Sequence, residues 1–217
     1  MTKPSPEQLR KSMFLYAVTS PNWLETSSLT ECVEQAILGG ATFIQLRDHN
    51  ASPEELKKQA ISLRKLCKTY HVPFVIDDNV ELAKELDLDG VHIGQADMPC
   101  SEARKLLGPD KIIGVSAQTV EHALKAQEDG ADYLGVGPVF PTNTKPGAAT
   151  VPFETVQAIS HAVNLPFVII GGLNESSISR MKHCGANGVA VVSAIFAAKD
   201  IQLASKALCE EIKKTLM

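Results

Sequence analysis

The chain lacks any apolar run long enough to cross a membrane and any apolar leader at its start. A membrane-spanning helix needs about 18 or more consecutive apolar residues, and no run in the sequence reaches that length. The segment Met1 to Lys11 is polar and does not have the character of a signal peptide. We therefore expect a cytoplasmic protein without membrane contact.

The sequence also lacks paired cysteines. None of its five cysteines stands in a CxxC pair or at the spacing of metal ligands. They are Cys32, Cys67, Cys100, Cys184 and Cys209. This scatter indicates buried thiols in a reducing compartment and speaks against a disulfide framework.

Basic clusters and hydrolytic motifs are missing as well. The formal net charge is -4, and no Lys/Arg block carries interleaved aromatic residues, so we expect no nucleic-acid partner. The absence of an HExxH motif and of a Ser-His-Asp or Cys-His arrangement gives no support to hydrolytic nucleophilic catalysis. An anionic ligand would have to be attracted by local positive charge.

The sequence does contain a regular alternation of apolar runs and segments with helical spacing. Eight strands are predicted near residues 13–18, 42–47, 73–77, 89–93, 111–115, 131–136, 165–170 and 187–192. Runs such as FVII and VAVV are typical of strands buried on both faces. We predict a single (β/α)8 TIM-barrel domain over residues 1–217, with residues 1–11 as a polar N-terminal extension. An open doubly wound sheet is the alternative, although it normally has fewer strands.

Helix starts are marked by two capping boxes. Ser28 stands three residues before Glu31, and Ser52 precedes Pro53 and Glu55. The first of these helices is expected to stop at the glycine pair 39–40. Both signals agree with helices that connect neighbouring strands.

Residues that follow the strands should converge, because the carboxyl ends of all strands of a parallel barrel open onto one face. Asp78 follows the third predicted strand and Asp97 closes the loop after the fourth. Two such carboxylates could hold Mg²⁺, which prefers oxygen ligands. The alternative is that both are helix caps or solvated loop acids.

Two basic residues occupy similar positions. Arg47 follows the second strand, and Lys145 lies in a long loop rich in proline, threonine and glycine after the sixth. Each could bind phosphate or form only a surface salt bridge, and the loop could be a binding loop or a surface insertion. Together with a metal ion the two cations would suit a pyrophosphate leaving group, whose developing charge must be stabilised.

Small residues follow the last two strands. The pair Gly171-Gly172 and the pair Val192-Ser193 would let backbone amides approach a phosphate, although glycines there could equally serve tight turns. His92 alternates with apolar neighbours inside a strand and is interpreted as a hydrogen-bonded core residue. The histidines on or beside helices are interpreted as surface residues, and these are His71, His122, His161 and His183.

Six segments in order carry a resemblance to a known family. They read IQLRDH, DGVHIGQAD, GVSAQT, GADYLGVGPVFPTNTK, IIGGLN and GVAVVSAI, and the similarity extends from about Leu15 to Ile195. In this combination they resemble the thiamine-phosphate synthases. The resemblance implies a Mg²⁺-dependent transferase (EC 2.5.1.3) of thiamine biosynthesis. It would join 4-amino-5-hydroxymethyl-2-methylpyrimidine pyrophosphate to 4-methyl-5-(2-phosphooxyethyl)thiazole, or its carboxylated tautomer, by a dissociative route.

The resemblance also implies roles for individual residues. Asp78 and Asp97 correspond to the metal ligands. The pyrimidine-pyrophosphate site would comprise Gln45, Arg47, Ser116 and Lys145, of which the last three are implied as catalytic. The thiazole-phosphate site would comprise Thr142, Thr144, Gly172, Val192 and Ser193. Further substrate-binding residues beside these would be Leu46, Asp48, His49, Asp77 and Asn143.

Three positions depart from the family pattern, which usually has lysine at His49, asparagine at Asp77 and histidine at Gln118. A neutral His49 and an anionic Asp77 would each weaken the attraction for pyrophosphate. Asp77 could instead strengthen the metal site, or point into the barrel because strand residues alternate in direction.

Other functions stay open at this point. A thiazole tautomerase-like relative would lack much of the pyrophosphate apparatus, and the retention of Asp78, Asp97 and Lys145 argues against it. A sugar-phosphate isomerase would need an acid/base pair that the sequence does not reveal. A non-catalytic phosphate-binding barrel would bind both substrates without forming product. The sequence does not decide between a monomer and a homo-oligomer.

Overall fold

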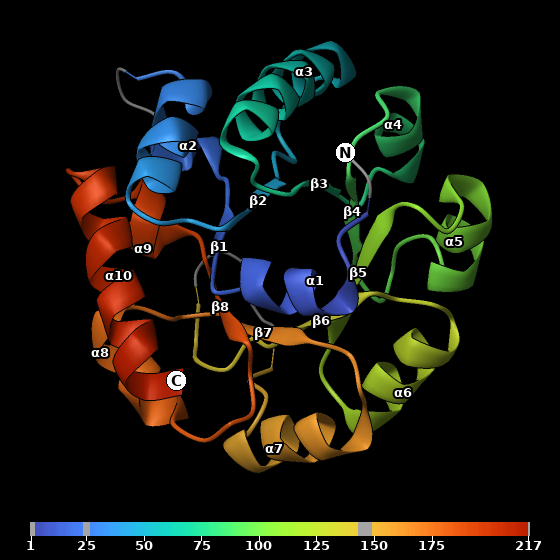
Figure 1. The fold of residues 1–217 in the computed structure, drawn as a ribbon, viewed down its shortest axis with the longest axis vertical. Helices are drawn as coiled ribbons and strands as arrows, with labels where there is room; N and C mark the ends of the chain where they lie inside the picture. The colour runs from blue at the N-terminus through green and yellow to red at the C-terminus, as the bar shows by residue number, and fades with distance from the viewer. Residues whose placement is uncertain (1–2, 24–26, 143–148, 217) are drawn as a thin grey trace.

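The strands form a closed parallel barrel in the computed structural model, which describes residues 3–23, 27–142 and 149–216. Each strand pairs with its neighbour in the sequence, and β8 returns to pair with β1 (Figure 1). The predicted (β/α)8 TIM barrel is confirmed, and the open doubly wound sheet is excluded. Among the residues described, no helix has the length and apolar character that crossing a membrane requires.

All eight predicted strands are present within a few residues of their expected bounds. They are β1 (Leu15–Val18), β2 (Phe43–Leu46), β3 (Phe74–Asp77), β4 (Gly90–Ile93), β5 (Ile112–Ala117), β6 (Tyr133–Val136), β7 (Phe167–Ile170) and β8 (Gly188–Val191). Nearly every strand residue is buried, as expected for a sheet covered on both faces.

Helices surround the strands as a ring, except for the first helix, which lies across one end of the barrel (Figure 1). They are α1 (Pro6–Ser12), α2 (Leu29–Leu38), α3 (Pro53–Tyr70), α4 (Val80–Glu85), α5 (Cys100–Leu107), α6 (Val120–Glu128), α7 (Phe153–Ala162), α8 (Glu175–Ile178), α9 (Ser193–Phe196) and α10 (Ile201–Leu216). The described residues also form two 3₁₀ turns, Pro21–Trp23 and Ser179–Met181. The capping boxes at Ser28 and Ser52 are confirmed, and Gly39 is the C-cap of α2.

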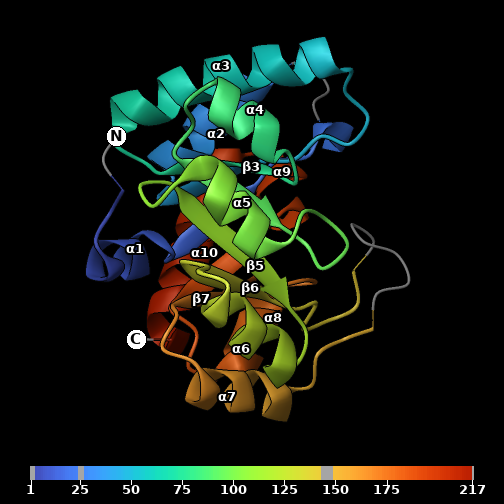
Figure 2. The ribbon, with the colours of Figure 1, turned by 90° about the vertical axis from the view of Figure 1, so that its right-hand side faces the viewer.

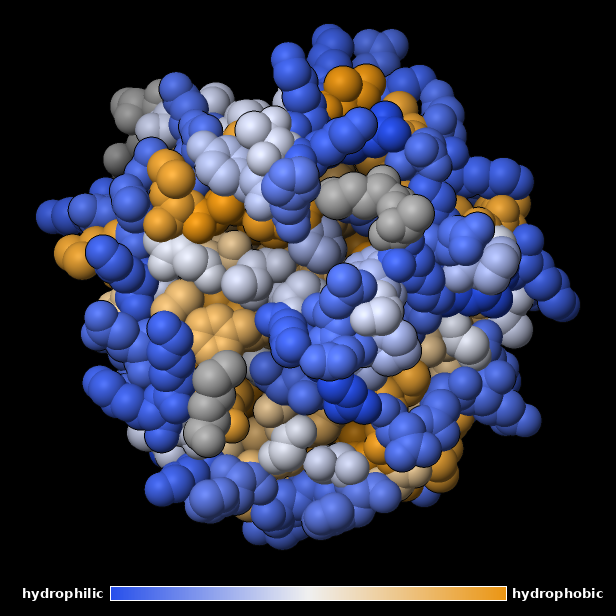
Figure 3. Space-filling view, viewed as in Figure 1, coloured by the Kyte–Doolittle hydropathy of each residue, from blue (hydrophilic) through white to orange (hydrophobic). Residues whose placement is uncertain are grey.

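The N-terminal end of the barrel is closed by α1, which precedes the first strand. Its side chain Leu9 is buried among residues from inside the barrel, including Met13 and Ile112. The helix crosses the barrel in Figure 1 and lies at its left in Figure 2, whereas the loops that follow the strands point to the opposite side. The face that carries α1 is mostly hydrophilic at its centre (Figure 3).

The core has two layers, because strand residues alternate between the barrel interior and the helices. The interior cluster is small and includes three aromatic rings, Tyr16, Phe43 and Tyr133, which pack against one another in tilted and edge-to-face contacts. Gly114 makes room for one of them, since a Cβ at this position would lie 2.0 Å from the Tyr133 ring. The larger cluster fills the space between strands and helices.

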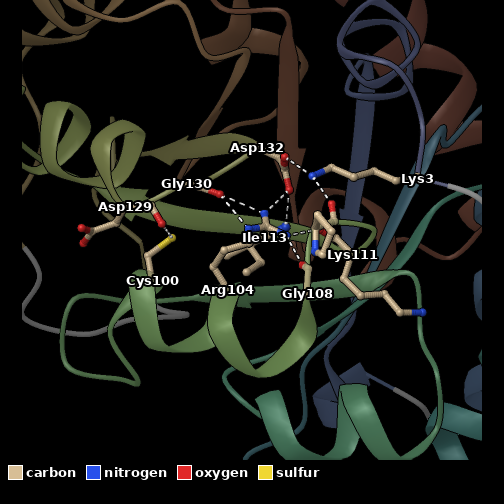
Figure 4. Close-up of polar contacts among 10 residues, drawn as sticks. Lys3, Cys100, Arg104, Gly108, Lys111, Ile113, Asp129, Gly130 and Asp132 are labelled. Carbon is tan, nitrogen blue, oxygen red and sulfur yellow. Dashed lines mark hydrogen bonds and ion pairs between the residues drawn. The ribbon is translucent and has the colours of Figure 1, made fainter.

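Arg104 of α5 ties the N-terminal ends of β5 and β6 together (Figure 4). Its guanidinium donates to the backbone oxygens of Gly108, Lys111 and Gly130 at 2.7–3.2 Å. It also contacts Asp132 at 2.7 Å. We call this group the Arg104 clamp; every donor and acceptor in it has a protein partner on this side of the barrel.

All five cysteines are buried and free, as the sequence indicates. Burial raises the pKa of each thiol, and that of Cys67 reaches about 12. The thiols therefore stay protonated and act as small apolar side chains in the core.

Candidate active site

A cavity of about 470 Å³ opens at the C-terminal end of the barrel. This is within the range of small-molecule sites, and it is the end where barrel enzymes place their chemistry. Most of the predicted site residues that the structure describes line it. They are Gln45, Arg47, His49, Asp77, Asp78, Asp97, Ser116, Thr142, Gly172, Val192 and Ser193.

The backbone of Arg47 is held in place by the side chain of Thr19. Its N–H donates to the hydroxyl of Thr19 at 2.9 Å, and the same hydroxyl donates to the Arg47 carbonyl at 3.3 Å. Thr19 is fully buried at the end of β1, so the start of the Arg47 side chain is fixed. The guanidinium then reaches across to β3, where Nε lies 3.2 Å from a carboxylate oxygen of Asp77.

Asp77 points into the cavity, one of the two orientations that the sequence allows. One carboxylate oxygen accepts a hydrogen bond from the side-chain amide of Gln45, and the other contacts Arg47. Nε2 of His49 lies 3.6 Å from this second oxygen. Two of the departures from the family pattern, His49 and Asp77, are therefore in contact with each other.

Asp78 is held in an unusual backbone conformation at the end of β3. Its φ is 58°, in the left-handed region, while its N–H donates to the carbonyl of His92 at 2.8 Å. Burial raises the pKa of the Asp78 carboxyl well above its usual range, and the charges of Asp77 and Asp97 raise it further. Strained residues and clustered like charges concentrate at functional sites.

The acidic residues suit a divalent cation. Ligand atoms of His49, Asp77 and Asp78 lie within 4.8 Å of one another, and Asp97 shares a hydrogen bond with Asp78. Since both oxygens of Asp77 already have protein partners, Asp78 and Asp97 are the better ligand pair. A cation between them would remove the repulsion that disfavours ionisation of Asp78, so the donor set fits Mg²⁺.

Polar side chains form the floor of the cavity over the aromatic cluster. Tyr16 donates to the Gln45 side-chain oxygen at 2.7 Å and lies 2.8 Å from the hydroxyl of Tyr133. Tyr133 lies 3.0 Å from Nδ1 of His92, whose Nε2 lies 3.0 Å from the hydroxyl of Ser116. His92 is thus confirmed as a buried, hydrogen-bonded residue, and it also lines the cavity.

The glycines after β7 are required by the packing of two loops. Gly171 and Gly172 have φ values of 98° and 62°. A Cβ on Gly172 would lie 2.5 Å from the carbonyl oxygen of Pro141, so the loop after β6 rests directly on it. Asn174 caps α8, since its side-chain oxygen accepts from the N–H groups of Ser176 and Ser177. A phosphate role for this side of the cavity stays a prediction.

Several predicted residues are not brought to the cavity wall. Leu46 is fully buried against the helices, because it alternates with Gln45 along β2. The Asp48 carboxylate accepts from the N–H groups of Asn50 and Ala51 and so shapes the loop before α3. The predicted residues Asn143, Thr144 and Lys145 lie outside the described residues.

The sequence analysis missed Tyr16 and assigned no role to Gln95 or Gln118, which also line the cavity. Alternation along β1 was the available signal for Tyr16, since an aromatic hydroxyl inside a small barrel must find a partner. His122 is a correction: it is half-buried on α6, and its buried Nδ1 has no hydrogen-bond partner among the described residues. The other helical histidines are exposed, as predicted.

Comparison with known proteins points in one direction. Residues 15–195 match the family described as thiamine monophosphate synthase. The thiamine-phosphate synthase of Clostridium tetani is 45% identical over 91% of this chain and 93% of its own length. That of Clostridioides difficile is 47% identical over 90% of this chain and 93% of its own length.

A solved structure agrees with these relatives. The thiamine phosphate pyrophosphorylase from Pyrococcus furiosus superposes with a TM-score of 0.88 and 37% identity, covering 96% of this chain and all of that one. The geranylgeranylglyceryl phosphate synthase of Thermoplasma acidophilum has a TM-score of 0.71 at 13% identity, which is evidence of a shared fold only. The likeness in sequence and in structure therefore extends over the whole barrel.

Proposed function

Because this chain belongs to the thiamine monophosphate synthase family and is a thiamine-phosphate synthase, we propose that its cavity binds an aminopyrimidine pyrophosphate and a thiazole phosphate together. The observation that carries the proposal is the shared cavity of Arg47, Asp78, Asp97 and Ser116, contributed by four different strand ends. Their charges and hydrogen-bonding groups suit a pyrophosphate ester attached to a polar ring.

Arg47 has the role of binding the pyrophosphate. Its backbone is fixed, and its planar guanidinium suits phosphate oxygens. The neighbouring Asp77 carboxylate partly offsets the positive charge of this guanidinium. Lys145 is proposed as a second cation from the loop after β6. The two cations stabilise the charge that develops on the leaving group.

Asp78 and Asp97 would hold Mg²⁺, to which their clustered carboxylates are suited. When bound, the ion supplies positive charge that neutralises the pyrophosphate oxygens. Asp97 is kept in place by its own loop, since its carboxylate accepts from the N–H of Gly94 at 2.8 Å.

Gln45 and Ser116 orient the pyrimidine ring on the floor of the cavity. The carbon–oxygen bond to pyrophosphate breaks, and its electron pair leaves with the oxygen. The lone pair of the thiazole nitrogen then forms the new carbon–nitrogen bond, so no residue has to act as a general base. Breaking the carbon–oxygen bond leaves a positive charge on the methylene carbon of the pyrimidine. Apolar wall residues such as Ile170, Leu173 and Ala190 keep water away from this pyrimidine cation.

The thiazole phosphate is proposed to bind on the side of the cavity opposite the pyrophosphate, where Gly172, Val192 and Ser193 line the wall. Loops after strands seven and eight bind phosphate in many barrels of this type. Thr142 lines the cavity and is proposed as a further substrate-binding residue, as are Asn143 and Thr144, which lie outside the described residues.

The direct test is to incubate the purified protein with both substrates and Mg²⁺ and to measure thiamine phosphate and pyrophosphate. Equal amounts of the two products are expected. Tight binding of both substrates without product would instead support a non-catalytic binding barrel. Turnover of the thiazole carboxylate to its tautomer alone would support the tautomerase-like alternative.

A further inference from the structure

Six side chains form one continuous hydrogen-bond chain beneath the cavity. Each comes from a different strand, and in order they are Asp77, Gln45, Tyr16, Tyr133, His92 and Ser116. We call this series the floor chain. It begins beside Arg47, the proposed pyrophosphate-binding cation, and ends at a hydroxyl on the cavity wall.

The direction of donation along the floor chain is set at its acidic end. Both carboxylate oxygens of Asp77 face donors, the side-chain amide of Gln45 and the guanidinium of Arg47, so Asp77 accepts at both oxygens. The group of Gln45 that faces Asp77 must therefore be its NH₂. The carbonyl oxygen of Gln45 is then turned toward Tyr16 and accepts its hydroxyl proton.

The two tyrosines transmit this direction, because each hydroxyl has a single proton to donate. Both rings are fully buried, and burial raises the pKa of each hydroxyl well above its usual value, so both stay protonated. Tyr16 donates to Gln45, and therefore its oxygen accepts from Tyr133 at 2.8 Å. Tyr133 has then used its own proton and must accept from Nδ1 of His92.

The donor and acceptor roles of His92 and Ser116, at the far end of the floor chain, follow from the same count of protons. A neutral His92 with its proton on Nδ1 has an unprotonated Nε2, which accepts the hydroxyl proton of Ser116. Ser116 then has only lone pairs left to offer a ligand. If the chain ran the other way, Nε2–H would donate to Ser116, and the serine would present its proton to the cavity.

We propose that Asp77 is a specificity-determining positioning residue, which acts through the floor chain to make Ser116 a hydrogen-bond acceptor for the amino group of the pyrimidine. The selectivity part rests on the proposed function, while the direction of the chain does not. An acceptor at Ser116 favours an amino ring over the corresponding oxo ring, since the oxo group would meet a lone pair instead of a proton.

The direction is tested by the tautomer of His92. The full-length protein is labelled with ¹⁵N-histidine, and the ring nitrogens are correlated with the ring protons by NMR. His92→Gln identifies the His92 signals among those of the six histidines. The wild-type protein should show protonated Nδ1 and unprotonated Nε2. A protonated Nε2, whether in the other tautomer or in a cationic ring, would overturn the proposal.

Two variants then interrupt the floor chain and one spares it. Asp77→Asn lets Gln45 turn its oxygen toward position 77, and Tyr16→Phe frees Tyr133 to donate to His92. Both should populate the Nε2–H tautomer. Asp97→Asn is the matched control, because it removes a cavity carboxylate outside the chain and should keep the wild-type tautomer. An unchanged tautomer in both chain variants, or the same change in the control, would contradict transmission from Asp77.

The selectivity is measured by calorimetry with 4-amino-5-hydroxymethyl-2-methylpyrimidine pyrophosphate and its 4-oxo analogue, in the presence of Mg²⁺. The wild-type protein should prefer the amino compound by about tenfold or more, and Asp77→Asn should reduce this ratio at least about threefold. An unchanged ratio would refute the specificity role. If the tautomers behave as expected but no thiamine phosphate forms, the proposed function alone fails.

Discussion

The two ends of the barrel use charged residues in opposite ways. At the N-terminal end, the Arg104 clamp joins one cation to Asp132 and three backbone oxygens, and Lys3 adds a contact to the other oxygen of Asp132 at 2.6 Å. At the C-terminal end, Asp77, Asp78 and Asp97 gather three carboxylates, and burial together with their mutual repulsion raises the pKa of Asp78. The first arrangement lowers the energy of the folded chain, and the second raises it.

This difference separates residues kept for stability from residues kept for chemistry. A like-charge cluster costs folding free energy and is retained where a cation or a cationic ligand repays that cost on binding. The floor chain lies between the two ends, where it connects the acidic cluster to the cavity wall. The following predictions begin with the largest expected effect.

Removing a proposed metal ligand should affect turnover most. Asp78→Ala and Asp97→Ala are each expected to lower kcat by about 10²-fold or more, the scale of losing one stabiliser of developing charge. Steady-state rates of thiamine phosphate formation across a Mg²⁺ titration would measure this. Full activity of the wild-type enzyme in excess chelator would refute the metal assignment.

Breaking the Arg104 clamp should affect stability rather than turnover. Arg104→Met removes one partner of Asp132, which keeps Lys3, and takes the donor away from three backbone oxygens. This change should cost about 2–3 kcal/mol of unfolding free energy. For a chain of this size that lowers Tm by about 4–12 °C. The kcat at 25 °C should remain close to that of the wild-type enzyme.

Arg64→Met is the matched control for the clamp. Arg64 forms an exposed ion pair with Asp87 at 3.2 Å, and its loss should cost less than about 0.5 kcal/mol. Calorimetric unfolding of both variants would measure the difference. Equal losses of stability would show that the clamp has no special structural role.

The contact between His49 and Asp77 should have a smaller effect, on substrate binding. His49→Lys places a permanent positive charge beside Arg47 and near Asp77, whose carboxylate lies 3.6 Å from Nε2 of His49 in the wild-type protein. We expect the KM for the pyrimidine pyrophosphate at pH 8 to fall about fivefold, equivalent to about 1 kcal/mol. Asp77→Asn made in the His49→Lys background tests the coupling of the two positions. Purely additive effects would mean that the two residues act independently.

The fold could be predicted almost completely from the sequence. The strands are short, apolar and regularly spaced, and capping residues such as Ser28, Ser52 and Asn174 fix helix starts by local hydrogen bonds. Local chemistry of this kind can be recognised without knowledge of the tertiary structure. The convergence of Arg47 and Asp78 also followed, because a parallel barrel brings its strand ends together.

The floor chain could not be predicted in this way. Tyr16 and Tyr133 are 117 positions apart, and their contact depends on the closure of the barrel and on the space that Gly114 leaves. The pairing of His49 with Asp77 depends likewise on rotamers chosen in three dimensions. Leu46 shows the converse error. The motif assigns this residue to the site, whereas strand alternation turns its side chain toward the helices.

The most direct test of the contrast between the two ends is the stability of Asp78→Asn without divalent cations. The folded state raises the pKa of Asp78 above its value in an unfolded chain, so the folded protein binds this proton more tightly. The stability therefore falls as the pH rises from the unfolded pKa toward the folded pKa. Asparagine removes the charge and tolerates the left-handed backbone at φ 58°.

Thermal unfolding at pH 8 should therefore give a Tm about 2–4 °C higher for Asp78→Asn than for the wild-type protein, on the scale of about 1 kcal/mol. The gap should narrow toward pH 5, where the wild-type carboxyl binds its proton. A lower Tm of the variant at pH 8 would mean that Asp78 stabilises the fold, and it would contradict the account of the acidic end as a site kept for catalysis.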